Sequence, residues 1–311
     1  MTNVAVIGAG LIGRAWSIVF ARAGFEVSLW DQFPLQTTQA MAFIADRLPE
    51  LREAGLLADA PEAVLARIHP MLSMWETVRD AEYIQENGPE RTDIKRPLFE
   101  ELERAAKPDA IIASSSSGIP ASAFTEHLKT RHRCLIAHPV NPPYLIPLVE
   151  ICPAPWTDPA VTERTRAIMV QAGQVPATVK KEIEGFALNR LQGALLAEAF
   201  RLVADDVISP ADLDALVKDG LGLRWSFMGP LETIDLNAPG GLKDYCDRYG
   251  PLYAKMQEQA LPLAWDASLV DRLHAARRDE LPLNMTPVRQ EWRDRRLMAL
   301  LAHKAGQPDR A

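Results

Sequence analysis

Residues 4–13 of the chain read Val4-Ala5-Val6-Ile7-Gly8-Ala9-Gly10-Leu11-Ile12-Gly13. The four apolar residues predict a buried strand, and three glycines in the pattern G-x-G-x-x-G follow it directly. We expect a helix from there to about Ala23, closed by Gly24, and a second strand over Glu26–Trp30 that ends in Asp31. The stretch therefore predicts a dinucleotide-binding turn in its full strand, turn, helix and strand context.

Each residue of this stretch suits a dinucleotide for a separate physical reason. Gly8 permits the tight turn, Gly10 lets the backbone approach a pyrophosphate, and Gly13 lets the helix pack on the sheet. The free N–H groups at the start of the helix, with the positive end of its dipole, attract phosphate groups. Asp31 lies 18 positions after Gly13, where a carboxylate can accept both ribose hydroxyl groups. A plain glycine-rich turn is the weaker interpretation, because the motif has its full context.

The composition is that of an ordinary globular protein. The chain has 311 residues, enough for about two domains, of which 48% are hydrophobic and 24% charged. Its formal net charge is −7 and it has no long basic run, so we expect neither nucleic acid nor membrane as a partner. No apolar segment approaches the roughly 20 residues that a membrane span needs.

The N-terminus and the cysteines point to a cytoplasmic protein. Met1-Thr2-Asn3 leads directly into the first strand, so we expect no signal or transit peptide. Cys134, Cys152 and Cys246 form no paired spacing, so we expect neither disulfides nor a metal site. These features favour the reducing cytoplasm.

Strands and helices alternate over the first part of the chain. Beyond the opening unit we expect helices over 34–51, 61–68, 92–106 and 159–172, and strands over 82–85, 110–113 and 174–179. This order predicts the α/β class, with a Rossmann-type, doubly wound and mostly parallel sheet. From Phe186 onward the pattern is helical, which predicts a second, all-helical domain. We place the domains at 1–184 and 185–311.

His138 and Glu150 are the candidate catalytic pair. His138 ends one apolar run and Glu150 ends the next, and Asn141-Pro142-Pro143 between them predicts two strands joined by a turn. A carboxylate that holds an imidazole fixes its tautomer and raises its basicity, as a general base near pH 7 requires. Taken alone, a histidine that caps a strand beside a surface glutamate is the simpler interpretation. The pair is favoured because the glycine turn, Asp31 and Ser117 also follow strand ends, where such sheets bind ligands.

Five other features stay open on sequence grounds. Glu90 and Lys95 lie in the loop and the first helical turn after a predicted strand, within reach of a ligand at the strand ends. Spacing alone favours a solvated charge pair. Residues 114–117 are four serines, either a hydrogen-bonding lip for a substrate or ribose oxygen or ordinary loop composition. Asn189 would bind a substrate oxygen or cap its helix. Residues 220–225 read as a glycine-rich loop that carries Arg224. Residues 288–304 read as an arginine-rich amphipathic helix, whose arginine-rich face is either only solvated or also in contact with a partner subunit.

Together these residues resemble the 3-hydroxyacyl-CoA dehydrogenase family over nearly the whole chain. The shared landmarks are 8–13, Asp31, Pro89-Glu90 with Lys95, the serine run, 138–141, 148–150 and 185–190. The resemblance is strongest to one branch, lambda-crystallin, which is the L-gulonate 3-dehydrogenase. The stretches that carry the branch are 137–144, 146–150, 209–214, 220–225, 229–233 and 245–249.

The resemblance implies a Rossmann domain that binds NAD and a helical domain that forms a homodimer. The implied cofactor contacts, together with the motif glycines, are Gly8, Gly10, Leu11, Ile12, Gly13, Asp31, Glu90, Lys95 and Ser115. His138 is implied as the base, Glu150 as the residue that orients it, and Ser117 and Asn189 as ligands of the substrate oxygen. The substrate contacts also include Asn141 and Arg224.

The function expected from this set is NAD-dependent oxidation of the C3 hydroxyl of a small 3-hydroxy acid, L-gulonate in the branch, to the 3-keto acid. Arg224 would pair with the substrate carboxylate, unless it only stacks on Trp225 at the surface. The alternatives are an L-3-hydroxyacyl-CoA dehydrogenase, an L-carnitine dehydrogenase and a non-catalytic, NAD-binding, crystallin-like structural protein. A structural role needs neither His138 nor Glu150, so their presence counts against it.

Overall fold

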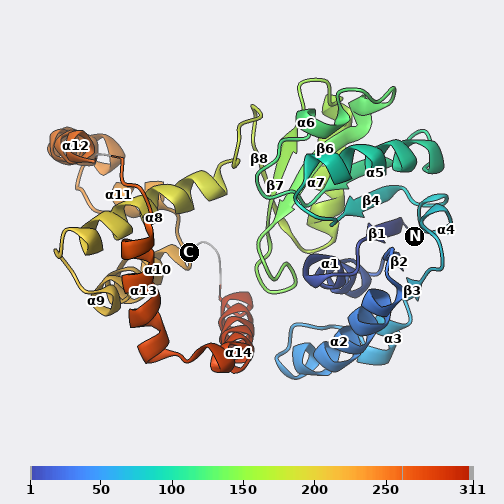
Figure 1. Cartoon of the computed structure of the whole chain (residues 1–311), viewed down its shortest axis with the longest axis horizontal. Coiled ribbons are helices and arrows are strands. Elements are labelled where there is room, and N and C mark those ends of the chain that lie inside the picture. Colours follow the sequence, from blue (N-terminus) through green and yellow to red (C-terminus); the bar gives the residue numbers. More distant parts are fainter. Residues whose placement is uncertain (1, 261, 308–311) are drawn as a thin grey trace. The chain divides into compact units, whose positions relative to one another are not determined.

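The computed structural model describes residues 2–260 and 262–307. The chain forms two compact units. The first holds the residues up to Arg190 together with Asp294–His303, and the second holds Leu191–Arg293 and the residues from Lys304 on. In Figure 1 the strands lie in the blue to yellow-green part of the chain, and the yellow to red part is helical.

An eight-stranded sheet forms the centre of the first unit, in the order β3-β2-β1-β4-β5-β6-β7-β8. Neighbouring strands are parallel except for β6 and β7, which are antiparallel. This confirms the predicted α/β class and the mostly parallel sheet. The strands are β1 (Asn3–Ile7), β2 (Glu26–Trp30), β3 (Ile68–Pro70), β4 (Tyr83–Glu86), β5 (Ile111–Ser114), β6 (Cys134–Pro139), β7 (Leu148–Pro153) and β8 (Val175–Thr178).

Helices cover both faces of the sheet, because successive strand residues point to opposite faces. Val4 and Val6 of β1 enter one buried cluster with residues of α1, α2 and α7, while Ala5 and Ile7 enter another with residues of α5. The sheet is therefore doubly wound. The helices of this unit are α1 (Leu11–Arg22), α2 (Pro34–Glu53), α3 (Pro61–Leu65), α4 (Met74–Val78), α5 (Thr92–Ala105), α6 (Ser122–Thr125), η1 (Arg131–Arg133) and α7 (Pro159–Gln171).

The predicted helix over 61–68 is only partly correct. Helix α3 ends at Leu65, and the chain then forms β3 along β2. The N–H of Val27 donates to the Arg67 carbonyl at 2.9 Å, and the N–H of Met71 donates to the Leu29 carbonyl at 2.9 Å. Pairing with an available sheet edge outweighs local preference in a segment this short.

Every regular element after β8 in the described residues is a helix, as predicted. These elements are α8 (Leu188–Ala204), α9 (Pro210–Ala215), η2 (Leu216–Leu221), α10 (Gly222–Trp225), α11 (Pro230–Asp235), α12 (Gly241–Gln259), α13 (Ala267–Glu280), η3 (Leu283–Met285) and α14 (Thr286–Ala305). Helix α8 starts in the first unit and continues into the second, and part of α14 belongs to the first unit. Within the described residues, no helix combines the length and apolar character needed to cross a membrane.

The prediction of a glycine-rich loop over 220–225 is wrong. The segment continues the helix that Ser209 caps, first as the π-helical turn η2 and then as α10. The N–H of Gly222 donates to the carbonyl of Val217, and a Cβ at Gly222 would lie 2.8 Å from that oxygen. Glycine here allows close helical packing rather than a break in the helix, and Arg224 is therefore a helical residue.

Candidate active site

The glycine turn joins β1 to α1 and leaves the start of the helix open. Gly8 has a φ of 91°, a conformation that favours glycine, and Gly13 packs on its carbonyl group. A Cβ at Gly10 would meet nothing within 4 Å, and no side chain caps the N-terminus of α1. Leu11, the first helical residue, is 53% exposed. This free helix end fits the pyrophosphate of a dinucleotide.

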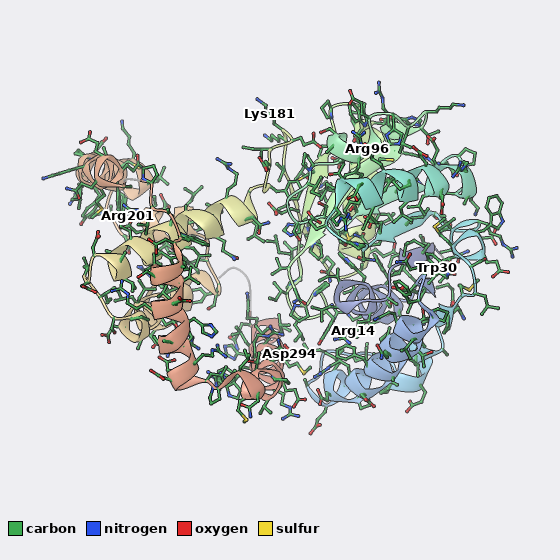
Figure 2. All side chains as sticks on the ribbon, viewed as in Figure 1. Arg14, Trp30, Arg96, Lys181, Arg201 and Asp294 are labelled. Atoms are coloured by element: carbon green, nitrogen blue, oxygen red, sulfur yellow. The ribbon has the colours of Figure 1, made fainter. Side chains whose placement is uncertain are left out.

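Asp31 follows β2 and is attached to the glycine turn. Its Oδ2 accepts a hydrogen bond from the N–H of Ala9 at 2.8 Å, and its Oδ1 accepts one from the N–H of Phe33 at 2.9 Å. A cavity of about 360 Å³ opens beside it, between residues of α2 and the end of β3. Figure 2 labels Trp30, the residue before Asp31. The carboxylate and the largely apolar cavity fit the adenosine half of NAD.

Lys95 is buried rather than solvated. It is 1% exposed, and its ammonium donates to both carboxylate oxygens of Glu86, at 3.0 and 2.8 Å. The Ser114 hydroxyl and the N–H of Gly88 also donate to Glu86, each at 2.6 Å. Glu86 is the last residue of β4 and, like the rest of that strand, it is buried. The cluster fixes the turn after β4.

Glu90 ties this turn to the serine loop after β5. Its Oε1 accepts hydrogen bonds from the Ser116 hydroxyl at 2.6 Å and from the N–H groups of Ser117, Gly118 and Ile119 at 2.9–3.1 Å. Burial works to raise the pKa of Glu90, but the hydrogen bonds from Ser116, Gly118 and Ile119 hold that pKa below its ordinary value. The carboxylate therefore orders the loop that carries Ser117.

Ser115 is the centre of a small polar network. Its hydroxyl accepts hydrogen bonds from Trp16 Nε1 at 3.0 Å and Gln85 Nε2 at 2.7 Å, and it donates to Asn87 Oδ1 at 2.7 Å. Gln85 Nε2 also donates to the carbonyl of Ala137 at 3.2 Å. The network joins α1, β4 and β5 to the strand residue that precedes His138.

His138 and Glu150 are partners in the antiparallel pairing of β6 and β7. Their side chains meet with Nδ1 of His138 2.9 Å from Oε2 of Glu150, and the residues are 5% and 2% exposed. In the parallel part of the sheet, His138 lies near the carboxyl end of β6, the edge at which the glycine turn, Asp31 and the serine loop follow their strands. The predicted hairpin therefore brings the two residues together in a buried pair.

The second oxygen of Glu150 binds the start of α8. Oε1 accepts hydrogen bonds from the N–H groups of Ala187 at 2.9 Å and Leu188 at 2.8 Å. Burial works to raise the pKa of Glu150, but the hydrogen bonds from His138, Leu188 and Ala187 outweigh it and lower the pKa below its ordinary value. Glu150 is thus held as a carboxylate with both oxygens occupied.

Ser117 and Asn189 line one open cavity of about 540 Å³, with Glu90 and Gly185 among its other residues. Asn189 Nδ2 donates to the backbone carbonyl of Ser117 at 2.6 Å, so the side chain is tied to the serine loop. Asn141 is exposed in the turn between β6 and β7. Arg224 is exposed on α10 in the second unit.

Phe186 is a residue of this site that sequence reasoning did not identify. Its side chain is fully buried and its ring centroid lies 5.6 Å from that of His138. In the sequence it reads as the first apolar residue of a helical pattern, with no sign of its backbone conformation.

The chain matches known proteins over nearly its full length. Residues 3–183 match the family model of the 3-hydroxyacyl-CoA dehydrogenase NAD binding domain, and residues 185–278 match that of the 3-hydroxyacyl-CoA dehydrogenase C-terminal domain. A lambda-crystallin homolog from Bos taurus is 43% identical over 303 residues, which cover 96% of this chain and 94% of that protein. An L-carnitine dehydrogenase from a Pseudomonas species is 39% identical over 262 residues, or 84% of this chain and 78% of that enzyme.

A solved structure also has the same fold. The 5-formyl-3-hydroxy-2-methylpyridine 4-carboxylic acid 5-dehydrogenase, described as an NAD⁺-dependent dismutase, superposes with a TM-score of 0.85 at 26% identity, covering 99% of this chain and 100% of that one. The two family matches, the glycine turn with Asp31 and these relatives agree on an oxidoreductase that uses NAD. The chain belongs to the 3-hydroxyacyl-CoA dehydrogenase family of NAD-dependent oxidoreductases.

Proposed function

We propose that the protein oxidises the C3 hydroxyl of a small 3-hydroxy acid, with L-gulonate as the first candidate, to the 3-keto acid. The observation that carries the proposal is the buried contact between Nδ1 of His138 and Oε2 of Glu150 at 2.9 Å. A carboxylate on Nδ1 favours the tautomer with its proton there, which leaves Nε2 with a free lone pair. That atom is the base for the substrate hydroxyl.

In this mechanism His138 Nε2 takes the hydroxyl proton as the C3 hydrogen leaves as hydride. NAD, when bound, supplies the hydride acceptor. Glu150 stabilises the imidazolium that forms, and its hydrogen bonds to Ala187 and Leu188 keep it ionised and fixed in place. Because the pair is buried, its electrostatic interaction is stronger than it would be in water.

We assign the substrate oxygen to Ser117 and Asn189. Both line the same cavity, and the hydrogen bond from Asn189 to the Ser117 carbonyl holds them at a constant separation. Preorganised donors of this kind stabilise charge that develops on an oxygen during reaction. Asn141, exposed after β6, is assigned to the polar groups of the substrate.

We assign the cofactor to the glycine turn with Leu11, Ile12 and Asp31 and to the loops after β4 and β5. Lys95 and Ser115 would support the cofactor site indirectly. Lys95 is hydrogen-bonded to Glu86, and Ser115 is hydrogen-bonded to Asn87. Glu90 would act by holding the serine loop.

The free acid is favoured as the substrate class over the thioester because Arg224 is an exposed guanidinium on the second unit. A guanidinium pairs with a carboxylate through two parallel hydrogen bonds, and a thioester carries no charge for it to meet. The L-carnitine dehydrogenase relative makes L-carnitine the second candidate, since it is also a 3-hydroxy acid.

The test is NADH formation with L-gulonate, L-carnitine and 3-hydroxybutyryl-CoA in parallel, with His138→Gln as the control variant. We expect the highest kcat/KM on L-gulonate, and a kcat lower by roughly 10²–10⁴-fold for the variant on whichever of the three is turned over. A preference for L-carnitine would make L-carnitine, and not L-gulonate, the proposed substrate. A preference for the thioester would refute the proposal that the substrate is a free acid. An absence of turnover with all three would favour the structural, NAD-binding alternative.

We also propose that the protein is a homodimer joined through the second unit and that it works in the cytoplasm. Large apolar side chains are exposed there within the described residues, among them Phe227, Leu231, Leu236, Leu252 and Trp265. Such surfaces in a soluble chain indicate an interface. Light scattering should give twice the chain mass of 34.4 kDa, and Phe227→Glu should shift it toward the monomer. The free, exposed thiol of Cys246 fits a reducing compartment.

A further inference from the structure

The turn before α8 has an unusual backbone. Gly185 and Phe186 both have positive φ angles, 73° and 51°. Glycine adopts such angles freely, but a bulky residue does so at a cost and only where its surroundings hold it. The N–H of Phe186 donates to the Ile183 carbonyl at 3.1 Å, and the N–H of Gly185 donates to the Gly118 carbonyl at 3.4 Å. The turn is thus tied to the serine loop.

The strained conformation places the Phe186 ring in the core beside His138. The side chain is fully buried and belongs to the same apolar cluster as Ile136 and Cys152, on the strands that carry the pair. The ring centroids of Phe186 and His138 lie 5.6 Å apart, with 50° between the ring planes. This is the tilted arrangement that aromatic rings prefer.

The same turn points the first amides of α8 at Glu150. The N–H groups of Ala187 and Leu188 donate to Oε1 at 2.9 and 2.8 Å, and the other oxygen faces His138. The N-terminus of a helix carries partial positive charge, which favours the carboxylate form. One turn therefore provides both an apolar cover for the imidazole and two fixed hydrogen-bond donors for its carboxylate.

We propose that Phe186 is a positioning residue for the His138–Glu150 pair. Its ring keeps water from the imidazole, and its left-handed turn holds the α8 amides on Glu150. The meaning of this for catalysis rests on the proposed role of His138 as the base. The contact itself does not depend on that role.

Few other ionisable groups surround the pair in the described structure. Cys152 lies two residues beyond Glu150 on β7. Glu182, which follows β8, interacts electrostatically with Cys152. The buried Lys95–Glu86 pair lies on the far side of β5, two strands from β6. Glu150 is the only group with a charge-paired contact to His138 within the described residues. The Phe186 ring therefore packs on an imidazole whose one charge-paired partner in the described residues is Glu150.

The experiment compares two truncations at one position with a control elsewhere. Phe186→Ala and Phe186→Gly both remove the ring, but only glycine relieves the strained φ. Phe25→Ala is the matched control, because Phe25 is equally buried and packs on Phe20 with the centroids 5.8 Å apart. Phe186→Leu keeps most of the apolar volume and serves if the truncated variants do not fold.

The measurement is the titration midpoint of the His138 imidazole by NMR in the ¹⁵N-histidine-labelled full chain, with the signal assigned from His138→Gln. Water admitted beside the ring favours the protonated imidazole, so the midpoint should rise by about half a pH unit or more in both truncations. It should rise less in Phe186→Leu and not at all in Phe25→Ala, although thermal stability falls in all of them. An unchanged or lower midpoint in the Phe186 variants would overturn the proposal.

A kinetic measurement separates this inference from the proposed function. If His138 is the base, the acid limb of kcat/KM moves to higher pH together with the midpoint, because the base acts only when it is unprotonated. If the midpoint moves while His138→Gln keeps wild-type activity, Phe186 still positions the pair and the proposed function fails. If His138→Gln is inactive and the midpoint does not move, the base role stands and the inference fails.

Discussion

Gly13 packs so closely on Gly8 that a Cβ at Gly13 would lie 1.7 Å from the Gly8 carbonyl oxygen. The backbone at Gly8 and Gly13 has little room to move, since most residues of β1 and of α1 are buried. The glycine motif of this chain therefore has a structural requirement at Gly13 that is separate from the cofactor. A Cβ at Gly10 would meet nothing within 4 Å, so Gly10 has no such packing requirement.

Gly13→Ala and Gly10→Ala should separate folding from cofactor binding. Gly13→Ala forces α1 away from β1 and should destabilise the fold by about 1–3 kcal/mol or more, as overpacking does. Gly10→Ala should leave the melting temperature nearly unchanged but weaken NAD binding, because its methyl group occupies the space for the pyrophosphate. Thermal unfolding and NAD titration measure the two effects. Equal melting temperatures for both variants would contradict the packing argument.

NAD should be preferred over NADP. The Asp31 carboxylate is fixed by the N–H groups of Ala9 and Phe33, so it would face a 2′-phosphate without moving away. The ratio of kcat/KM values for the two cofactors measures the preference. Asp31→Asn removes the charge but keeps only one of the two acceptor oxygens, so it also loses one of the two backbone hydrogen bonds, and the ratio should shrink. An unchanged ratio in this variant would assign the preference to other residues.

His138→Gln should lose the base while keeping the cofactor site. General base catalysis is worth roughly 10²–10⁴-fold, so kcat should fall by about that factor while the Kd for NAD stays the same. Ser17→Ala is a suitable control, because Ser17 is buried in α1 and bonds only to the Gly13 carbonyl among the contacts described. A near-normal kcat for His138→Gln would exclude the base assignment.

The free energy of unfolding should fall in acid partly because of Glu150. The pKa of this carboxyl is lowered in the folded protein, so its contribution is complete above the ordinary value of about 4.3 and is lost as pH falls through the lower folded value. Urea unfolding between about pH 6 and pH 3 should show a steeper loss in wild type than in Glu150→Gln. Parallel curves would mean that Glu150 adds no pH-dependent stability.

Arg224→Met should weaken activity on a charged substrate. A hydrogen bond to a charged group contributes about 1.5–3 kcal/mol, so kcat/KM on the 3-hydroxy acid should fall about 10- to 150-fold. The loss should be much smaller on the methyl ester, which lacks the carboxylate. Equal losses on acid and ester would exclude the contact between Arg224 and the substrate carboxylate.

The sequence predicted the elements whose signals are local. The strand, glycine turn and helix of 4–22 and the hairpin that pairs His138 with Glu150 are found in the structure. Their alternation also predicted the sheet, because connections in α/β folds follow few topologies. Each of these conclusions needed only the order of apolar runs and turn residues along the chain.

Features that depend on neighbours could not be predicted in the same way. The segment 220–225 is helical because its glycines allow close packing, although the same glycines are typical of loops. Strand β3 exists because the edge of β2 is available to pair with it. The burial of Lys95 follows from its partner Glu86, nine residues earlier, and no periodic pattern identifies such a pair. The positive φ of Phe186 leaves no trace in composition or spacing.

The first unit takes in Asp294–His303 of α14. Met298 belongs to the same buried cluster as Val4 and Val6 of β1, and the Tyr144 hydroxyl donates to Asp294 at 3.4 Å. Asp294 is labelled in Figure 2. Most of the second unit, Leu191–Arg293, therefore lies in the sequence between two parts of the first. A ribosome that makes the chain from its N-terminus delivers this last segment of the first unit only after some 290 residues. Until then the cofactor-binding unit lacks the contacts of Asp294 and Met298, and a truncation after Arg190 would remove these contacts permanently.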